Sequence, residues 1–224
     1  MRRRKTLSVV IVSYNSRRFL YACLTKLMDA LSSLDHEIYL VDNHSRDDSV
    51  SIVKTYFPQV RLIRNTKNLG FGSACNKALS HVQGDYVLFL NPDVQVRADT
   101  LRGLLSYIEK HPHIGILTCK LLYPDGSLQY SCRRYPSLLV HFIGILFPRS
   151  QLARHYLMLD EDHSHIQEID WSLGAFLLIR KEVFQQICGF DERFFLYFED
   201  GDFCRRAKKA GWNIVYTPHY SAIH

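Results

Sequence analysis

Short apolar runs alternate with helical patterns through the first half of the chain, and this alternation constrains the fold more than any other feature. Four runs predict strands, at Leu7–Ser13, Glu37–Val41, Val60–Ile63 and Tyr86–Leu90. Helices are predicted between them, over Leu20, Leu24, Leu27, Leu31 and Leu34, at Asp47–Tyr56 and at Ser73–Val82. Such units build a Rossmann-type, mostly parallel sheet flanked by helices. A chain of 224 residues, 47% of them hydrophobic, suits a single α/β domain.

The pattern is less regular in the second half of the chain. A helix is predicted at Ala98–Lys110, a strand at Ile114–Lys120 and a Pro-Asp-Gly turn at Tyr123–Gly126. Residues Ser127–Ile169 have no clean period, which is typical of a ligand-binding insertion or lid rather than core sheet. The last predicted elements are a strand at Trp171–Ile179, a helix at Lys181–Ile187 and a helix at Asp200–Ala210 that Gly211 ends.

The charge balance favours acidic partners. Lysine and arginine number 28 against 22 acidic residues, a formal charge of +6 that suits nucleotides, phosphorylated lipids and membrane surfaces. Because the basic residues are dispersed and accompany no recognition motif, nucleic acid is not predicted as a partner. The six cysteines are scattered without a C-x-x-C pair, which predicts neither zinc nor disulfides and favours a reducing, cytoplasmic compartment.

One segment raises the question of membrane contact. No apolar run reaches the about 20 residues that span a bilayer, and the basic start at Arg2–Lys5 does not lead into a signal peptide. Leu138–Phe147, flanked by Arg133, Arg134 and Arg149, suits either a membrane interface or a buried core helix. The sequence therefore predicts a soluble protein or one peripheral on the inner face of the plasma membrane.

Polar residues and glycines follow each predicted strand of the first half. They are Ser13, Tyr14 and Asn15; Asp42 and Asn43; Asn65, Asn68, Gly70 and Gly72; and Asn91 and Asp93. In an open parallel sheet, ligands bind outside the carboxyl ends of the strands. We therefore expect these residues to share one ligand-binding edge.

Two positions on this edge have alternative interpretations. Asp42 suits hydrogen bonds from a ribose hydroxyl or a base N–H, and equally the cap of the following helix. Gly70 and Gly72 open a helix and allow its backbone to approach an anionic ligand closely. Because Cys75 stands where a dinucleotide fingerprint has its third glycine, a dinucleotide dehydrogenase is disfavoured.

Three carboxylates are candidates for chemistry. Asp93 follows a strongly apolar strand and suits a divalent cation that bridges a diphosphate, although Asn-Pro-Asp also favours an ordinary turn. Glu199 and Asp200 are adjacent carboxylates beside an aromatic stretch, an environment that can tune a general base. Acidic residues at the start of a helix with a basic end also suit the helix dipole alone.

Together these residues resemble family 2 glycosyltransferases over essentially the whole chain. The matching motifs, in order, are Val9–Asn15, Val41–Ser45, Asn68–Gly72, Leu90–Asp93, Trp171–Ala175 and Phe198–Asp200. The resemblance implies a GT-A-like fold, an inverting single displacement and a nucleotide-diphosphate sugar donor. Residues 1–97 would then form the nucleotide-sugar-binding half and residues 98–224 the acceptor-binding half.

The resemblance also implies a role for each matched residue. Asp200 would be the base that deprotonates the acceptor hydroxyl, and Glu199 beside it would orient the acceptor. Asp93 and His224 would be ligands of a divalent cation, Mn²⁺ or Mg²⁺. Donor contacts are implied for Ser13, Tyr14, Asn15, Asp42, Asn68, Gly70, Gly72, Asn91 and Asp93, and acceptor contacts for Trp171, Gly174 and Glu199.

One departure from the family pattern points to a subgroup. The usual Asp-x-Asp metal motif appears here as Asn91-Pro92-Asp93, whose missing charge should weaken metal binding. This motif and the segment Pro124–Pro136 resemble the rhamnosyltransferase-like branch. The branch implies dTDP-rhamnose as donor and a polyprenyl-diphosphate-linked saccharide as acceptor, in O-antigen or cell-wall polysaccharide synthesis. A UDP- or GDP-sugar donor, a nucleotidyltransferase and a degenerate binding module without activity are the alternatives.

The end of the chain is a second departure. The sequence stops at His224, where the resemblance implies further C-terminal helices, so a truncation is one expectation. As the last residue His224 is expected to fray, which would weaken its metal-binding role.

Overall fold

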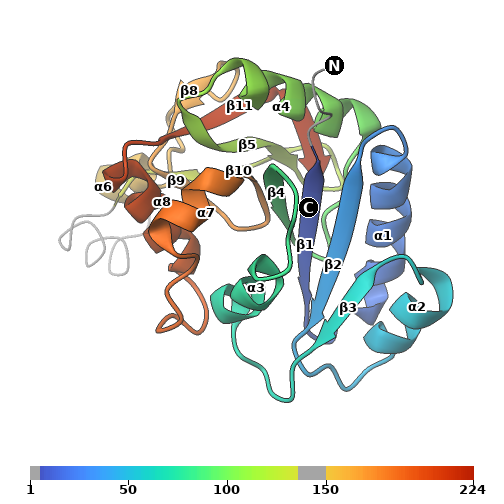
Figure 1. Ribbon diagram of the computed structural model, residues 1–224. Coiled ribbons are helices and arrows are strands. Elements are labelled where there is room, and N and C mark those ends of the chain that lie inside the picture. The colour runs from blue at the N-terminus through green and yellow to red at the C-terminus, as the bar shows by residue number, and fades with distance from the viewer. Residues whose placement is uncertain (1–5, 136–149) are drawn as a thin grey trace, which may run out of the picture.

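A computed structural model describes residues 6–135 and 150–224. One nine-stranded sheet has the order β3-β2-β1-β4-β10-β5-β11-β8, with β6 paired to β5, and a small sheet consists of β7 and β9 (Figure 1). The strands are β1 Leu7–Ser13, β2 His36–Asp42, β3 Arg61–Arg64, β4 Tyr86–Leu90, β5 Ile114–Leu122, β6 Leu128–Gln129, β7 Cys132–Arg133, β8 Gln167–Glu168, β9 Trp171–Ser172, β10 Phe176–Arg180 and β11 Asn213–Ile223. The helices are α1 Arg17–Leu31, α2 Ser49–Tyr56, α3 Phe71–Leu79, α4 Ala98–Lys110, α6 Gln151–Tyr156, α7 Lys181–Ile187 and α8 Glu199–Lys209.

The first four strands form the parallel part of the sheet, as predicted. β1 pairs in parallel with β2 and β4, and β2 pairs in parallel with β3. All but one residue of β1 is buried, as expected of an apolar strand covered on both faces. The register aligns Ser13 with Asp42 and Ile11 with Leu90. The polar residues that follow these strands are therefore brought to one edge.

Helices cover both faces of the sheet and enclose two hydrophobic cores. Apolar residues of α1, α2 and α4 pack in the first core, and those of α3, α7 and α8 pack in the second. Leu24 of α1 and Phe203 of α8 illustrate the two sides, since both are fully buried. This arrangement confirms the predicted α/β fold of a sheet flanked by helices.

The strand β10 determines how the second half of the chain reaches the ligand edge. It lies between β4 and β5 and is antiparallel to both. Its first residue, Phe176, therefore pairs with Leu90 at the end of β4. The three residues before it, Leu173–Ala175, arrive beside Asn91, whose N–H donates to the Ala175 carbonyl at 3.0 Å.

Three details differ from the sequence-based predictions. The single strand predicted at Trp171–Ile179 is wrong, because Leu173–Ala175 interrupts it and β9 pairs with β7 instead. Residues Ser127–Ile169 were predicted to lie outside the sheet, but β6 and β8 join it as two-residue strands. The helix α3 begins at Phe71, two residues before the predicted start.

The strand β11 was not predicted. It pairs in parallel with β5, and its register shifts between Thr217 and Ser221. Pro218 lies in this shift, where its missing N–H does not interrupt the ladder. The apolar run Ile214–Tyr216 indicates a strand, but a proline two residues after it argues against one, so the strand was not predicted.

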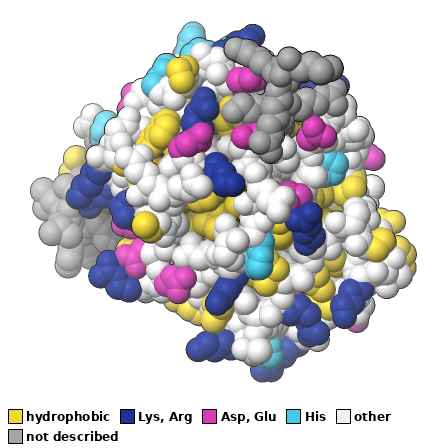
Figure 2. Space-filling view, viewed as in Figure 1, with side chains coloured by type: hydrophobic (Ala, Val, Ile, Leu, Met, Phe, Trp, Pro, Cys, Tyr) yellow, Lys and Arg dark blue, Asp and Glu magenta, His cyan; other side chains and the backbone are white. Residues whose placement is uncertain are grey.

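Surface charge and the length of apolar helices bear on whether the protein binds acidic partners or a membrane. Lys and Arg side chains are interleaved with Asp and Glu over the upper part of the face shown in Figure 2, whereas Lys and Arg predominate along its lower edge. Within residues 6–135 and 150–224, no helix is long and apolar enough to cross a membrane. The segment predicted to contact the membrane, Leu138–Phe147, and the cluster Arg2–Lys5 lie outside the described residues.

Candidate active site

A cavity of about 520 Å³, here called the strand-end cavity, lies at the carboxyl ends of β1, β2 and β4. It brings together several of the residues predicted to bind the donor, namely Tyr14, Asn68, Gly70, Asn91 and Asp93. Val12, Ser16, Asn43, Phe71, Pro92, Phe195 and Leu196 complete its lining. Residues from four separate motifs of the sequence thus meet in one place.

Asp42 and Ser13, next in sequence to the lining residues Asn43 and Tyr14, have unused hydrogen-bonding capacity. The Asp42 carboxylate is 1% exposed, and its Oδ1 accepts from the Ser45 N–H at 3.2 Å. Asp42 Oδ2 and Ser13 Oγ are buried and have no hydrogen-bond partner among the described residues. Among those residues the nearest cation to Oδ2, Arg64 Nε, is 4.0 Å away, which is too far for a hydrogen bond. The helix-cap interpretation of Asp42 is wrong, because α2 begins only at Ser49. A buried carboxylate oxygen without a hydrogen bond is costly and suits a ligand hydroxyl or N–H.

Asn43 lines the strand-end cavity, whereas Asn15 lies outside it. The Asn15 side chain accepts from the Arg46 N–H at 2.8 Å and does not line the cavity. Asn43 donates to Asn68 Oδ1 at 2.7 Å and to the Gly70 carbonyl at 3.1 Å, and accepts from the Leu69 N–H at 2.9 Å. Asn43 therefore holds the Asn68–Gly70 loop, a positioning role that its place after Asp42 in the sequence did not reveal.

The glycines Gly70 and Gly72 are required by close packing. Gly70 has a φ of +82°, and a Cβ at this position would lie 2.0 Å from the Phe195 carbonyl oxygen. A Cβ on Gly72 would lie 3.0 Å from the Phe190 Cβ. The N–H of Phe71, the first residue of α3, donates to the Phe195 carbonyl at 3.3 Å. The Phe71 N–H, at the start of this helix, is thus already satisfied by the loop before α8.

We expect Gly70→Ala to destabilise the protein by about 3 kcal/mol, since strain at positive φ adds to a clash with backbone. Gly126→Ala is the matched control, because Gly126 has a φ of +84° and a Cβ at this position would meet no atom within 4 Å. Its cost should be about 1 kcal/mol from strain alone. Chemical denaturation of both variants measures the difference, and equal losses would contradict the packing role of Gly70.

Asp93 and His224 form a pair at the rim of the strand-end cavity. His224 Nε2 lies 3.4 Å from Asp93 Oδ1, and hydrogen bonding to His224 lowers the pKa of the Asp93 carboxyl. The expected fraying of His224 is wrong: its N–H donates to the Leu122 carbonyl at 2.9 Å, and its side chain is 16% exposed. The last residue is held by β5 and extends β11 to the ligand edge.

The donor set of this pair fits a divalent cation. His224 Nδ1 lies 2.8 Å from Gln129 Oε1. A tautomer with its proton on Nδ1 would leave the lone pair of Nε2 beside the Asp93 carboxylate. Two electron-pair donors in this arrangement require a proton or a cation between them. No set of three or more His, Cys, Asp or Glu among the described residues could hold a metal alone. A cation at this pair would therefore share its coordination with phosphates, as Mg²⁺ commonly does.

A second cavity of about 270 Å³, here called the carboxylate cavity, adjoins the first and shares Phe71, Asn91 and Leu196 with it. Leu173, Gly174, Ala175, Tyr197, Glu199, Asp200 and His224 complete its lining. The predicted base and the predicted metal ligands thus open onto neighbouring spaces. The residues shared by the two cavities mark where a donor and an acceptor could meet.

Asp200 is held rigidly at the start of α8. Its Oδ2 accepts from the Gly174 N–H at 3.0 Å and its Oδ1 from the Gly201 N–H at 2.8 Å. Burial raises the pKa of the Asp200 carboxyl, while these two N–H groups act in the opposite direction. Gly174, predicted as an acceptor residue, therefore also orients the predicted base.

Glu199 is more deeply buried than Asp200. It is 5% exposed, and its Oε2 has no hydrogen-bond partner among the described residues. Burial, and then the neighbouring charge of Asp200, raises the pKa of the Glu199 carboxyl. The pair thus provides one carboxylate fixed by the backbone and one with a free acceptor oxygen.

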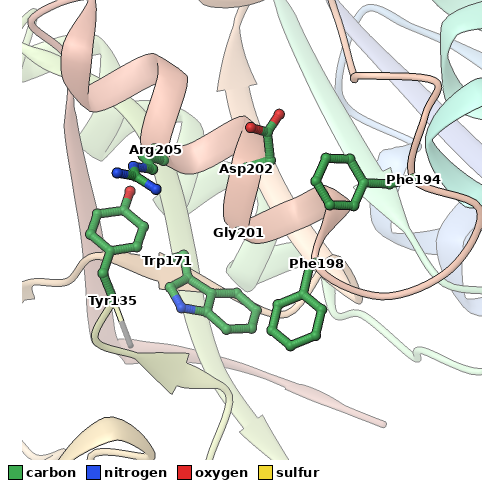
Figure 3. A pocket seen from close by; sticks show the side chains of 7 residues that line it. All are labelled: Tyr135, Trp171, Phe194, Phe198, Gly201, Asp202 and Arg205. Atoms are coloured by element: carbon green, nitrogen blue, oxygen red, sulfur yellow. The ribbon is translucent and has the colours of Figure 1, made fainter. Parts of the chain in front are cut away.

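Trp171 lies apart from the other predicted acceptor residues. It is 5% exposed and lines a third space of about 200 Å³, here called the aromatic cavity (Figure 3). The lining consists of Tyr135, Trp171, Phe194, Phe198, Gly201, Asp202 and Arg205. The structure therefore places Gly174, but not Trp171, in the carboxylate cavity with Asp200.

Two curated relatives are similar to almost the whole chain. The N-acetylglucosaminyl-diphospho-decaprenol L-rhamnosyltransferase of Mycobacterium tuberculosis is 33% identical, over 97% of this chain and 75% of that protein. The rhamnosyltransferase WbbL of Escherichia coli is 28% identical, over 96% of this chain and 82% of that protein.

Solved structures show the same fold. The mannosyltransferase PcManGT of Pyrobaculum calidifontis, in complex with GDP-Man and Mn²⁺, superimposes with a TM-score of 0.70 at 18% identity. The match covers 100% of this chain and 57% of that one, so this chain spans little more than half its length. The expected GT-A-like fold is confirmed. The family model described as Glycosyl transferase family 2 matches residues 8–199, and the chain belongs to this family.

Proposed function

We propose that the protein transfers L-rhamnose from dTDP-rhamnose, with inversion, onto a lipid-linked saccharide in O-antigen or cell-wall polysaccharide synthesis. The observation that carries the proposal is the junction of two cavities, one with the Asp93–His224 pair and one with Asp200. In a single displacement with inversion, the acceptor oxygen attacks the anomeric carbon from the side opposite the leaving diphosphate. The base must therefore lie on the acceptor side and the groups that stabilise the diphosphate on the other side. The two rhamnosyltransferase relatives support the choice of sugar.

In this proposal residues 1–97 bind the donor in the strand-end cavity. Asp42 Oδ2 and Ser13 Oγ have no hydrogen-bond partners among the described residues. Asp42 Oδ2 would accept a hydrogen bond from the nucleoside, and the Ser13 hydroxyl would donate or accept one. Tyr14, Asn68 and Asn91 would contact the remainder of the donor. Asp93 and His224 would hold Mn²⁺ or Mg²⁺, which when bound neutralises negative charge on the departing diphosphate.

Residues 98–224 supply the acceptor side, where Asp200 acts as the base. Its carboxylate takes the proton of the acceptor hydroxyl while the acceptor oxygen bonds to the anomeric carbon and the bond to the diphosphate oxygen breaks. The N–H groups of Gly174 and Gly201 fix the carboxylate before the reaction, so little reorganisation is required. Glu199 Oε2 would accept from a second acceptor hydroxyl and orient the sugar.

The raised pKa of Asp200 predicts an acid limb in the rate profile. The base acts only when deprotonated, so kcat/KM should fall as the pH falls through the Asp200 pKa. Because burial raises this pKa, the midpoint should lie above the value of about 3.9 found for a free aspartate. A pH series with wild type and Glu199→Gln checks the assignment, and a midpoint at or below the free value in both would contradict it.

A thermal-shift screen tests the donor. The dTDP, UDP and GDP series of nucleotides and sugars would each be added with and without Mn²⁺ or Mg²⁺, because a ligand that binds the native state raises its melting temperature. A metal-dependent shift with dTDP compounds supports the proposal. A preference for UDP or GDP compounds would keep the transferase and change the sugar, and no shift with any of them would favour a degenerate module.

Lipid-linked acceptors require a location at the membrane. The Mycobacterium tuberculosis relative is named for an acceptor of this kind, N-acetylglucosaminyl-diphospho-decaprenol. We propose that the protein works in the cytoplasm, peripheral on the inner face of the plasma membrane. Pelleting with anionic vesicles that contain such an acceptor, compared with vesicles that lack it, would test this location.

A further inference from the structure

The aromatic cavity has no part in the chemistry described above, yet it lies directly beside the carboxylate cavity. Asp200 lines the carboxylate cavity and the next residue, Gly201, lines the aromatic cavity. The preceding loop is divided in the same way, because Tyr197 lines the carboxylate cavity and Phe198 lines the aromatic cavity. A molecule bound at Asp200 could therefore extend around the start of α8 into the aromatic cavity.

The loop between the cavities is unusually apolar for a surface segment. Phe195, Leu196, Tyr197 and Phe198 are 58%, 55%, 73% and 42% exposed, respectively. Tyr197 and Phe198 also have positive φ angles of 68° and 67°, which are strained for aromatic residues. Strained backbone of this kind is concentrated at functional sites, where it fixes side chains for a ligand. Phe198 lines the aromatic cavity, so this end of the loop offers an apolar contact to a ligand there.

The cavity also contains polar groups without protein partners. Figure 3 shows the Tyr135 hydroxyl directed toward the Arg205 guanidinium. This hydroxyl is buried and has no hydrogen-bond partner among the described residues, and burial raises its pKa, so it is a neutral donor. Arg205 is exposed and forms no ion pair with any residue that the structure describes.

The acidic residue of the cavity does not compensate Arg205. Asp202 Oδ2 accepts from Arg206 Nε at 2.7 Å, and this pair is on the same helix, four residues apart. The Asp202 carboxylate is therefore paired with Arg206 and not with Arg205. A guanidinium and a phenolic O–H together are well suited to phosphate oxygens.

We propose that the aromatic cavity binds the diphosphate of the acceptor, through Arg205 and Tyr135, and packs Trp171, Phe194 and Phe198 against the first isoprenoid carbons. This inference rests on the proposed function, which places the acceptor hydroxyl at Asp200. It adds the site where the lipid end of the acceptor leaves the protein. The aromatic lining and the uncompensated guanidinium match a ligand that is anionic at one point and apolar beyond it.

Binding of farnesyl diphosphate tests the site directly. The measurement is made with excess dTDP and Mn²⁺ so that the donor cavity is filled, and Trp171 fluorescence in a Trp212→Phe background reports on the aromatic cavity. Wild type should bind the probe more tightly than farnesol or inorganic diphosphate. Arg205→Gln should bind about tenfold more weakly, since a charge-assisted hydrogen bond is lost.

Two further variants sharpen this test. Tyr135→Phe removes only the hydroxyl and should weaken farnesyl diphosphate binding while leaving farnesol binding unchanged. Arg102→Gln, an exposed arginine on α4, is the charge-matched control and should bind like wild type. Equal binding by Arg205→Gln and Arg102→Gln, or equal affinity of wild type for farnesol and farnesyl diphosphate, would overturn the site. Binding of the probe only in the absence of dTDP and Mn²⁺ would overturn it as well.

Turnover separates this site from the proposed function. For Arg205→Gln, KM should rise about tenfold for a lipid-diphosphate acceptor and stay constant for a simple glycoside of the same sugar, with kcat retained. Unchanged KM for both acceptors would contradict the site and leave the rhamnosyltransferase proposal intact. The protein could instead bind farnesyl diphosphate in an Arg205-dependent manner and transfer no sugar. That result would contradict the proposed function and support the site.

Discussion

Asp200→Asn is expected to bind the donor as wild type does and to transfer sugar about 10³-fold more slowly, within the range of a lost general base. The substitution keeps the size of the side chain and one acceptor oxygen for the Gly174 or Gly201 N–H. The amide cannot take the acceptor proton. The donor cavity is lined by other residues, so its occupancy should not change.

Single-turnover kinetics and a nucleotide titration separate these effects. The amide nitrogen faces a backbone N–H whose hydrogen bond the carboxylate accepts in wild type, so a modest loss of stability is also expected. Glu199→Gln is the matched control, because it alters the neighbouring carboxylate and leaves the base in place; its expected effect is on KM for the acceptor. A transfer rate close to wild type in Asp200→Asn would exclude Asp200 as the base.

Asp93→Ala is expected to lose the metal-dependent part of donor binding, with dTDP affinity in Mn²⁺ falling about 10²-fold toward its metal-free value. The reason is that Asp93 is the carboxylate of the Asp93–His224 pair, and Asn91 offers no second charge. Without Mn²⁺ the variant should bind dTDP as wild type does. The same carboxylate also fixes the His224 ring, so both ligands are affected.

Calorimetric titration of dTDP with and without Mn²⁺ measures this dependence. Asp99→Ala on α4 is a suitable control, since it removes an exposed carboxylate whose partner is Arg97. A metal dependence that persists in Asp93→Ala would contradict the assigned role. Equal loss of donor binding in Asp93→Ala and Asp200→Asn would contradict the division between leaving-group and nucleophile residues.

Local patterns were sufficient to predict the first half of the fold. The strands β1 and β4 are mainly apolar runs, β2 and β3 have apolar centres, and the leucines of α1 recur at helical spacing, so each element is indicated by its own residues. The second half depends on pairing between distant segments. β9 and β10 separate because the chain must bring Gly174 to Asp200, a contact across 26 residues that no local pattern contains.

The candidate site was predictable where the residue is polar and follows a strand. Asp42, Asp93 and Asp200 were found in this way, since a carboxylate after an apolar strand or at a helix start is conspicuous. The role of Asn43 in holding the loop and the carbonyl of Phe195 beside Gly70 depend on three-dimensional packing. The aromatic cavity could not be predicted for the same reason, because Tyr135 and Arg205 come together only in the folded chain.

The central claim is that Asp200 and the Asp93–His224 pair serve one inverting transfer, and the stereochemistry of the product tests it most directly. Purified protein would be incubated with dTDP-rhamnose, Mn²⁺ and a lipid-linked N-acetylglucosamine acceptor, and the anomeric configuration of the product read by NMR. The account predicts a rhamnosylated product with the configuration opposite to that of the donor. A product that retains the donor configuration would contradict a single displacement with Asp200 as base.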